Sequence, residues 1–210
     1  MTIAELWRYP VKSMAGERLE RATLGPLGID GDRLVHVARF LGRIATARKF
    51  PRLLSHRAVL GPGGEPLVDG RPWDDPAVAA EIVEMVGRGA RLVRDDARAF
   101  DVLPLLVATD GAIEAFGRDG RRLRPNTVLG GVEGLAERRW EGRTLRIGEV
   151  EIALEDLRDR CVMTTYDPDT QVQDPRVLRD IVERFEGKLA LNARVVRGGT
   201  LAVGDDVRLV

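Results

Sequence analysis

Residues 144–166 read TLRIGEVEIALEDLRDRCVMTTY, and this stretch decides the expected fold class. It predicts three short strands, Thr144–Ile147, Val150–Leu154 and Val162–Tyr166, because each is rich in Val, Ile, Leu or Thr and a glycine separates the first two. The only cysteine of the chain, Cys161, immediately precedes the third of these strands. The stretch therefore predicts a β-rich fold with the cysteine next to a strand.

The same kind of segment recurs along the rest of the chain. Seven more strands are expected at Thr2–Arg8, Leu19–Leu24, Arg33–Phe40, Ser55–Leu60, Leu105–Thr109, Leu191–Val196 and Val207–Val210. Two helices are expected to begin at Asp75-Pro76 and Asp174-Pro175, and a shorter one near Asp110. Many strands with few helices favour a strand-dominated α+β class with antiparallel sheets, including a closed barrel, over alternating βαβ units.

Size and charge restrict the classes of function. The 210 residues fit one large domain or two small ones, and the best division lies near residues 93–98, giving parts 1–95 and 96–210. Lys and Arg together number 33, as do Asp and Glu, so a nucleic acid or membrane partner is not expected. Charged residues interrupt the N-terminal segment, and no stretch approaches a bilayer span of about 20 apolar residues. We therefore expect a cytoplasmic, reduced protein.

The single cysteine is the first candidate for chemistry. It cannot form an internal disulfide or supply a four-cysteine cluster, and the two histidines are too few for most histidine-rich metal sites. A thiolate is the form that attacks as a nucleophile or binds a metal, and nearby charge from Arg158 or Arg160 would favour that form of Cys161. The alternative is that Cys161 is a small buried apolar residue without chemistry.

Further basic and polar residues follow local breaks in the chain. Lys12 and Ser13 come after Tyr9-Pro10, and Arg33 ends a turn of residues 28–32. Three others of this kind are Arg48, Arg124 and Asn126. Such side chains on loops can converge on a phosphate or on an extended polar ring system. Each one alone is more often a solvated surface residue.

Taken in order, these motifs resemble a known family. Residues 9–13 with Gly16, residues 28–33, residues 46–48 and residues 51–53 resemble the N-terminal β-barrel domain that precedes MOSC domains. A second group of motifs resembles the MOSC domain itself. It consists of Asp101, Pro104-Leu105, Thr109, residues 124–126, Trp140, residues 147–148, Arg160-Cys161, residues 164–165, residues 167–170 and residues 203–205. The order and spacing hold from residue 7 to the C-terminus, and the match in register is far more specific than any single motif.

The resemblance is closest to the amidoxime-reducing component family and its bacterial relatives. It implies a β-barrel-like MOSC domain packed with a smaller N-terminal β-rich domain, and a molybdenum cofactor whose metal Cys161 ligates. It also implies cofactor contacts from eight residues: Lys12, Ser13, Arg33, Arg48, Thr109, Arg124, Asn126 and Arg160. A soft thiolate suits a metal that is already bound by dithiolene sulfurs. Asp101 is the candidate for proton delivery beside the metal.

The function implied is that of a molybdenum-cofactor-dependent reductase of N-hydroxylated or N-oxide-type small molecules. It would need a separate electron-transfer protein, since the chain carries no iron–sulfur cysteines and no dinucleotide motif. Two alternatives use the same residues: a non-enzymatic carrier of the cofactor, or a sulfur carrier in which Cys161 holds a persulfide. A third alternative is a β-rich binding domain with an inert cysteine.

Overall fold

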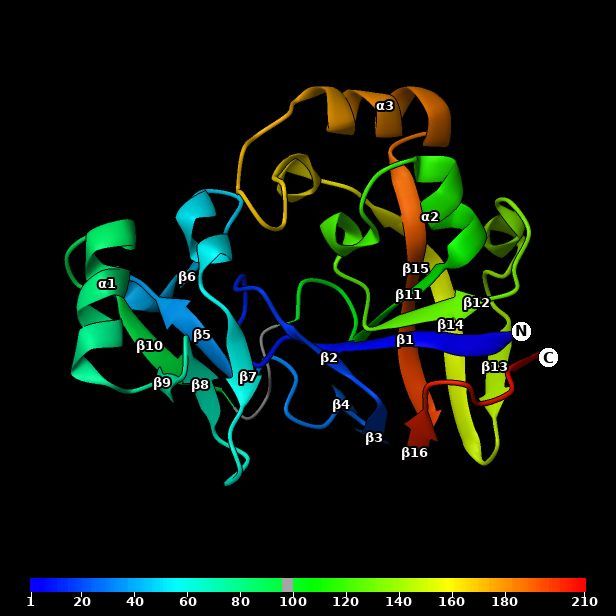
Figure 1. Cartoon of the computed structure of the whole chain (residues 1–210), viewed down its shortest axis with the longest axis horizontal. Helices are drawn as coiled ribbons and strands as arrows, with labels where there is room; N and C mark the ends of the chain where they lie inside the picture. Colours follow the sequence, from blue (N-terminus) through cyan, green and yellow to red (C-terminus); the bar gives the residue numbers. More distant parts are fainter. Residues whose placement is uncertain (96–99) are drawn as a thin grey trace.

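The computed structural model describes residues 1–95 and 100–210, and it has the expected strand-dominated α+β class (Figure 1). Its largest sheet, within the described residues, has eight strands in the order β17-β13-β14-β15-β11-β12-β1-β2. In chain order these are β1 (Thr2–Arg8), β2 (Glu17–Leu19), β11 (Leu105–Thr109), β12 (Thr127–Gly130), β13 (Thr144–Ile147), β14 (Val150–Asp159), β15 (Lys188–Arg197) and β17 (Arg208–Leu209). Neighbouring strands are antiparallel except β11 and β12, which the helix α2 (Asp110–Phe116) joins in parallel.

Three smaller sheets complete the strand arrangement. One contains β16 (Gly199–Ala202), β3 (Arg21–Gly25) and β4 (Gly28–Ile29), and its buried side chains join the core of the large sheet. The other two are β10 (Arg91–Arg94), β5 (Val35–Ala38) and β6 (Ile44–Ala45), and β7 (Ala58–Leu60), β8 (Pro66–Val68) and β9 (Arg71–Pro72). With α1 (Pro76–Val86) they enclose a second core, which forms the left part of the molecule in Figure 1.

The first strands of the chain pair with strands from its second half. Strand β1 pairs with β12, and β3 pairs with β16. Both chain ends lie at the same side of the large sheet (Figure 1), where Thr2 forms a β-bridge with Asp206. The division expected between residues 95 and 96 touches residues 96–99, which lie outside the described residues, so the domain boundary stays a prediction.

The three helices form where their capping signals predict. The Asp75 side chain accepts a hydrogen bond of 2.7 Å from the backbone of Ala77, and α1 ends before Gly87. The helix α3 (Arg176–Phe185) follows Asp174-Pro175, and its residues at spacing four, Val177, Ile181 and Phe185, are buried. In residues 1–95 and 100–210, no helix combines the length and the apolar composition that a bilayer crossing requires.

The strand expected at Val162–Tyr166 is wrong, because this segment forms the 3-10 helix η5 (Val162–Thr165). The Thr164 hydroxyl donates a 2.8 Å hydrogen bond to the carbonyl of Cys161, and the Thr165 hydroxyl donates one of 2.6 Å to Val162. Such local bonds stabilise a turn that strand propensity does not predict. Four other 3-10 helices are described: η1 (Phe40–Gly42), η2 (Pro51–Ser55), η3 (Gly120–Leu123) and η4 (Ala136–Arg139).

Other strands differ from expectation at their limits. The strand expected at Leu19–Leu24 is two strands, β2 and β3, with a break at Glu20. The strand expected at Arg33–Phe40 covers only Val35–Ala38, since the positive φ of 53° at Arg33 is incompatible with extended backbone. Strands β14 and β15 are longer than expected, with ten residues each.

Candidate functional site

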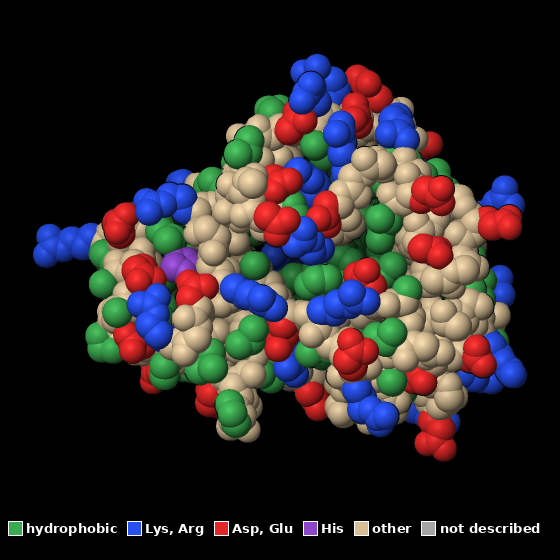
Figure 2. Space-filling view, in the orientation of Figure 1, with side chains coloured by type: hydrophobic (Ala, Val, Ile, Leu, Met, Phe, Trp, Pro, Cys, Tyr) green, Lys and Arg blue, Asp and Glu red, His purple; other side chains and the backbone are tan. Residues whose placement is uncertain are grey.

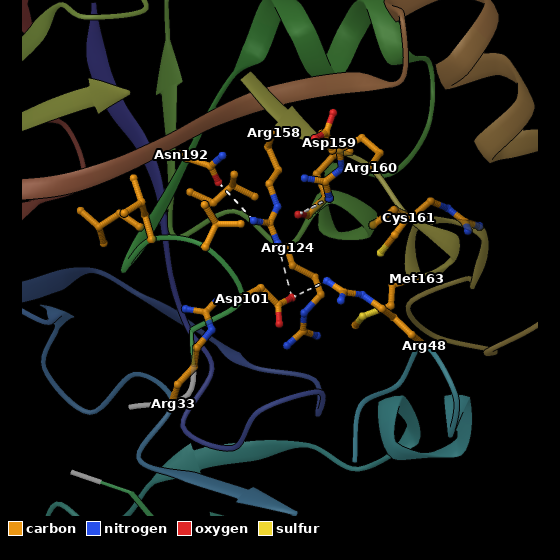
Figure 3. Close-up of a pocket in the computed structure, with 16 residues that line it drawn as sticks. Arg33, Arg48, Asp101, Arg124, Arg158, Asp159, Arg160, Cys161, Met163 and Asn192 are labelled. Atoms are coloured by element: carbon orange, nitrogen blue, oxygen red, sulfur yellow. Dashed lines mark hydrogen bonds and ion pairs between the residues drawn. The ribbon is translucent and has the colours of Figure 1, made fainter. Parts of the chain in front are cut away.

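Part of the polar set predicted from the sequence lines one pocket together with Cys161: Arg33, Arg48, Asp101, Arg124 and Arg160. The pocket encloses about 590 Å³ with its open mouth included, and it lies between the loops that carry Arg33 and Arg48 and the segment Arg158–Met163 (Figure 3). Figure 2 shows a hollow near the centre of this face, where Lys, Arg, Asp and Glu side chains gather. The pocket therefore joins the two halves of the chain.

Cys161 lies on this pocket between the end of β14 at Asp159 and the start of η5 at Val162. The backbone of Arg160 donates a 2.8 Å hydrogen bond to the carbonyl of Gly187, and after that contact the chain turns into η5. The thiol is partly exposed and forms no disulfide, and it lines the pocket near Met163 and Arg48 (Figure 3). Burial lowers the pKa of Arg48, but Asp101 and a hydrogen bond with the Cys161 side chain outweigh burial and raise it.

Asp101 connects three cations at the wall of the pocket. Its carboxylate lies 2.6 Å from Nζ of Lys12, 2.9 Å from Nη2 of Arg48 and 3.4 Å from Nη2 of Arg158. Burial alone would raise the pKa of Asp101, but the three cations outweigh it and lower the pKa below its ordinary value. Asp101 is therefore ionised at neutral pH, where it holds no proton to deliver.

Arg124 lines the pocket and has a left-handed backbone conformation, with φ of 56°. Its guanidinium stacks over the Tyr9 ring at 4.2 Å and donates a 2.7 Å hydrogen bond to the carbonyl of Met14. The Tyr9 hydroxyl donates a 3.1 Å hydrogen bond to the carbonyl of Pro125, and burial raises the pKa of Tyr9 to about 12. Burial also lowers the pKa of Arg124. These contacts fix the loop that carries Arg124. No carboxylate among the described residues forms an ion pair with its guanidinium.

Arg160 has hydrogen-bond donors that the described part of the chain leaves unsatisfied. Its Nη2 donates a 2.7 Å hydrogen bond to the carbonyl of Leu123, while its buried Nε and Nη1 have no partner there. Burial lowers the pKa of Arg160 to about 10. Unpaired buried donors on a cation are unfavourable in a folded protein, and functional sites are where they are retained. These two nitrogens suit an anionic ligand.

Three further residues of the predicted set, Ser13, Arg33 and Lys12, lie on or next to the pocket wall. The Ser13 hydroxyl accepts a 3.1 Å hydrogen bond from the backbone of Ala47, so it orders the loop that carries Arg48. Arg33 lines the pocket and pairs with the buried Asp32, whose other oxygen accepts a 2.7 Å hydrogen bond from the backbone of Tyr9. Lys12 is buried and reaches the pocket through its ion pair with Asp101.

Two predicted cofactor contacts find no support in the structure. The Thr109 hydroxyl caps α2 by accepting a 3.1 Å hydrogen bond from the backbone of Ala112, and it contacts Glu137 at 3.3 Å. The buried Asn126 side chain accepts a 3.1 Å hydrogen bond from the backbone of Leu106 and donates one of 3.4 Å to the carbonyl of Trp7. Neither residue lines the pocket, because both side chains hold neighbouring backbone segments together.

Several pocket residues were missing from the predicted set, among them Arg158, Asn192 and Arg122. Arg158 lies near the end of β14, two residues before Arg160, and both line the pocket. Asn192 accepts a 3.3 Å hydrogen bond from Arg158, and it is a polar residue within the apolar run of β15. Arg122 pairs with Asp167 at 2.8 Å and so holds η5 beside the pocket. A polar residue in a buried strand was the signal for Asn192.

Replacing Asp101 by asparagine is expected to destabilise the protein in a pH-dependent way. The folded pKa of Asp101 is below its unfolded value, so its ion pairs contribute fully above about pH 4 and are lost as pH falls through the folded pKa. We expect a loss of about 1–2 kcal/mol at pH 7 that shrinks below pH 4. Thermal unfolding of both proteins between pH 2 and 7 tests this, and a difference that stays constant over that range would contradict it.

Comparison with known proteins gives the same assignment for both parts of the chain. Residues 1–101 match the MOSC N-terminal beta barrel domain, and residues 112–208 match the MOSC domain. Mitochondrial amidoxime reducing component 2 of Macaca fascicularis is 28% identical over 244 residues, which cover 88% of this chain and 72% of that protein. Mitochondrial amidoxime-reducing component 1 of Mus musculus is 26% identical, covering 100% of this chain and 82% of its own.

A solved structure shares the fold. The crystal structure of the YuaD protein from Bacillus subtilis superposes with a TM-score of 0.55 at 14% identity, covering 99% of this chain and 94% of that one. The two domain matches together confirm the resemblance expected from the motifs at residues 9–13, 124–126 and 160–161. The chain belongs to the MOSC-domain proteins, with a MOSC N-terminal beta barrel domain preceding its MOSC domain.

Proposed function

We propose that this protein is a molybdenum-cofactor-dependent reductase of N-hydroxylated or N-oxide-type compounds, with Cys161 as the metal ligand. The observation that carries the proposal is a thiol on the wall of a pocket that also contains two guanidiniums without a described carboxylate partner, Arg124 and Arg160. The names of the relatives support it, since both are amidoxime-reducing components. A thiol beside excess positive charge suits a metal bound to an anionic organic ligand.

The residues present fit such a cofactor. Cys161 would bind the metal, and the guanidiniums of Arg33, Arg48, Arg124 and Arg160 would hold its anionic groups. Guanidinium groups bind phosphate through charge-assisted hydrogen bonds, and the unsatisfied Nε and Nη1 of Arg160 are two donors for such bonds. Lys12 would act through Asp101, which it contacts at 2.6 Å. When bound, the cofactor supplies the two-electron chemistry that side chains cannot provide.

The chain's own residues would bind, orient and shield the reactants. Asp101 keeps Arg48 and Arg158 in place, and Arg48 in turn contacts the Cys161 side chain. Because Asp101 is ionised at neutral pH, it would accept hydrogen bonds rather than donate a proton. The protons that convert the released oxygen into water would then enter from solvent through the mouth of the pocket, and the electrons would come from a separate electron-transfer protein. The cytoplasmic location expected from the sequence stays a prediction.

Turnover assays with two electron sources test the proposal. Molybdenum-loaded protein is expected to reduce benzamidoxime when reduced viologen donates electrons, and to show no turnover with NADH alone, since no dinucleotide motif is present. The measurement is oxidation of the dye with a panel of amidoximes, N-oxides and sulfoxides. If loaded protein oxidises the dye no faster than its Cys161→Ala variant on every substrate, the cofactor-carrier function replaces the reductase.

A further inference from the structure

The turn between β5 and β6 presents two large apolar side chains to solvent. Phe40 and Leu41 lie in η1, and each is 78% exposed, the highest exposed fraction of any large apolar residue in the described part of the chain. Ile44 follows at the start of β6 and is 41% exposed. Strands β5 and β6 belong to the left part of the molecule in Figure 1, away from the large sheet. Large apolar side chains that are exposed next to each other mark an interaction surface, whereas scattered single ones need no explanation.

The backbone of this turn holds Leu41 in a strained conformation. The backbone of Arg39 donates a 2.8 Å hydrogen bond to the carbonyl of Arg43, and the backbone of Gly42 donates one of 3.0 Å to the carbonyl of Arg39. Leu41 has a φ of 61°, in the left-handed region that bulky side chains avoid. A glycine or an asparagine would suit this turn better and would expose less apolar surface. Strain and exposed apolar area therefore occur at the same residue, as is typical of positions kept for a contact.

The balanced total charge of the chain, from which no membrane partner was expected, hides an uneven distribution. Residues 33–64 contain seven Lys and Arg residues and no Asp or Glu. Three of the seven pair with acidic residues outside this segment, and the other four form no ion pair within residues 1–95 and 100–210: Arg39, Arg43, Lys49 and Arg57. The segment is therefore positively charged as a whole, and it attracts anionic partners.

Cations gather at the base of the apolar turn. The Arg39 guanidinium lies 5.1 Å from the centre of the Phe50 ring, and Nζ of Lys49 lies 5.9 Å from it, so both charges approach one aromatic side chain. Arg43 is joined to Arg39 by the backbone hydrogen bond of the turn. On the neighbouring strand β10, the exposed Arg91 is in register with the residue before Arg39. Apolar side chains thus form the tip of the turn, and cations lie behind them.

We propose that this turn binds the protein to the surface of an anionic lipid bilayer, with Phe40 and Leu41 inserted below the lipid phosphates. The order of the groups matches the depth profile of a bilayer, because the apolar tip would reach the acyl chains while the cations at its base meet the phosphates. A projecting tip enters a bilayer without a preformed hollow, which a protein partner would have to supply. The binding would be peripheral and would need no cofactor. The cytoplasmic leaflet is anionic, which agrees with the expected location.

Sedimentation with lipid vesicles tests this proposal on the 210-residue chain. We expect the wild type to bind vesicles of about 70% phosphatidylcholine and about 30% phosphatidylserine, and to bind pure phosphatidylcholine at least about 10-fold more weakly. Raising NaCl from about 0.1 M to about 0.5 M is expected to weaken binding to the anionic vesicles, because salt screens the cations at the base of the turn.

Single substitutions separate the tip from the rest of the surface. Leu41→Gly removes the side chain and suits the positive φ, so we expect unchanged or higher stability with binding to anionic vesicles about 10-fold weaker. Val172→Ser is its matched control, because Val172 is 66% exposed before α3, and this variant should bind as the wild type does. Arg43→Gln should weaken binding about fivefold, whereas Arg139→Gln, at an exposed position in η4, should have no effect.

Phe40→Trp measures the insertion itself. Lipids brominated in their acyl chains are expected to quench the fluorescence of this variant more strongly than that of the wild type, whose three tryptophans lie elsewhere. Equal quenching in both proteins, or undiminished binding by Leu41→Gly, would overturn the proposal. A wild type that binds neither kind of vesicle would also overturn it, in favour of an acidic protein as the occupant. A dimer that Leu41→Gly converts to monomer in size-exclusion chromatography would show that a second copy covers the tip, which contradicts the proposal as well.

Discussion

Replacing Cys161 by alanine is expected to abolish N–O reduction, with a fall in kcat of at least about 1,000-fold, while the protein stays folded. The thiol is the only cysteine sulfur of the chain, and it lies on the pocket wall beside Arg48 and Met163. No other side chain in the described part of the pocket can supply a thiolate to a metal. Dye oxidation by loaded protein, compared with the wild type at equal concentration, measures the effect.

The stability of the same variant serves as its control. Cys161 is partly exposed and makes no disulfide, so truncation should cost about 1 kcal/mol or less. The carbonyl of Cys161, which accepts two hydrogen bonds from Thr164, remains in the variant. We expect a melting temperature within about 4 °C of the wild type. Substantial activity in well-folded Cys161→Ala would contradict the role of the thiol.

Replacing Arg160 by methionine is expected to have opposite effects on the cofactor-free and the loaded protein. Without cofactor, Arg160 is a buried cation with two donors that no described group satisfies, so its removal should leave stability unchanged or raise it. With cofactor, the variant loses charge-assisted hydrogen bonds worth about 1.5–3 kcal/mol, which corresponds to a loss of affinity of about 10- to 150-fold. Urea unfolding and molybdenum retention during dialysis measure the two effects.

Arg158→Met is the matched control for this experiment. Arg158 lies two residues before Arg160 and lines the same pocket, but it is paired with Asp101 at 3.4 Å and with Asn192 at 3.3 Å. Its removal should therefore destabilise the cofactor-free protein, because it breaks an existing network. If Arg160→Met destabilises the cofactor-free protein as much as Arg158→Met does, then Arg160 is a structural residue and the anion site is wrong.

Local sequence signals predicted the elements that depend on local interactions. The strands β1, β11 and β13 have the expected limits, because their runs of mostly apolar residues end near a proline, a helix cap or a glycine. The helix α1 begins at the expected Asp75-Pro76. The pairing of β1 with β12 joins residues more than 100 positions apart, and no local pattern encodes such a partner. The turn at η5 depends on two threonine hydroxyls, which strand propensity does not include.

The candidate site was predictable in outline and not in its contacts. The residue types at Lys12, Arg33, Arg48 and Arg124 indicated an anion site, since cations at chain breaks can converge on one ligand. Asn126 was expected to bind the cofactor; its buried amide accepts a hydrogen bond from the backbone of Leu106 and does not line the pocket, so that contact stays a prediction. The network around Asp101 was not predictable, because its cations come from loops and a strand far apart in the sequence.

X-ray absorption at the molybdenum edge tests the central claim most directly, because it counts the sulfur atoms bound to the metal. The sample is protein produced in a host that makes the cofactor, and the comparison is Cys161→Ser, which keeps the size of the side chain and removes the sulfur. We predict about one molybdenum per chain, with one sulfur ligand more in the wild type than in the variant. Molybdenum bound with the same number of sulfur ligands in both proteins would contradict the account.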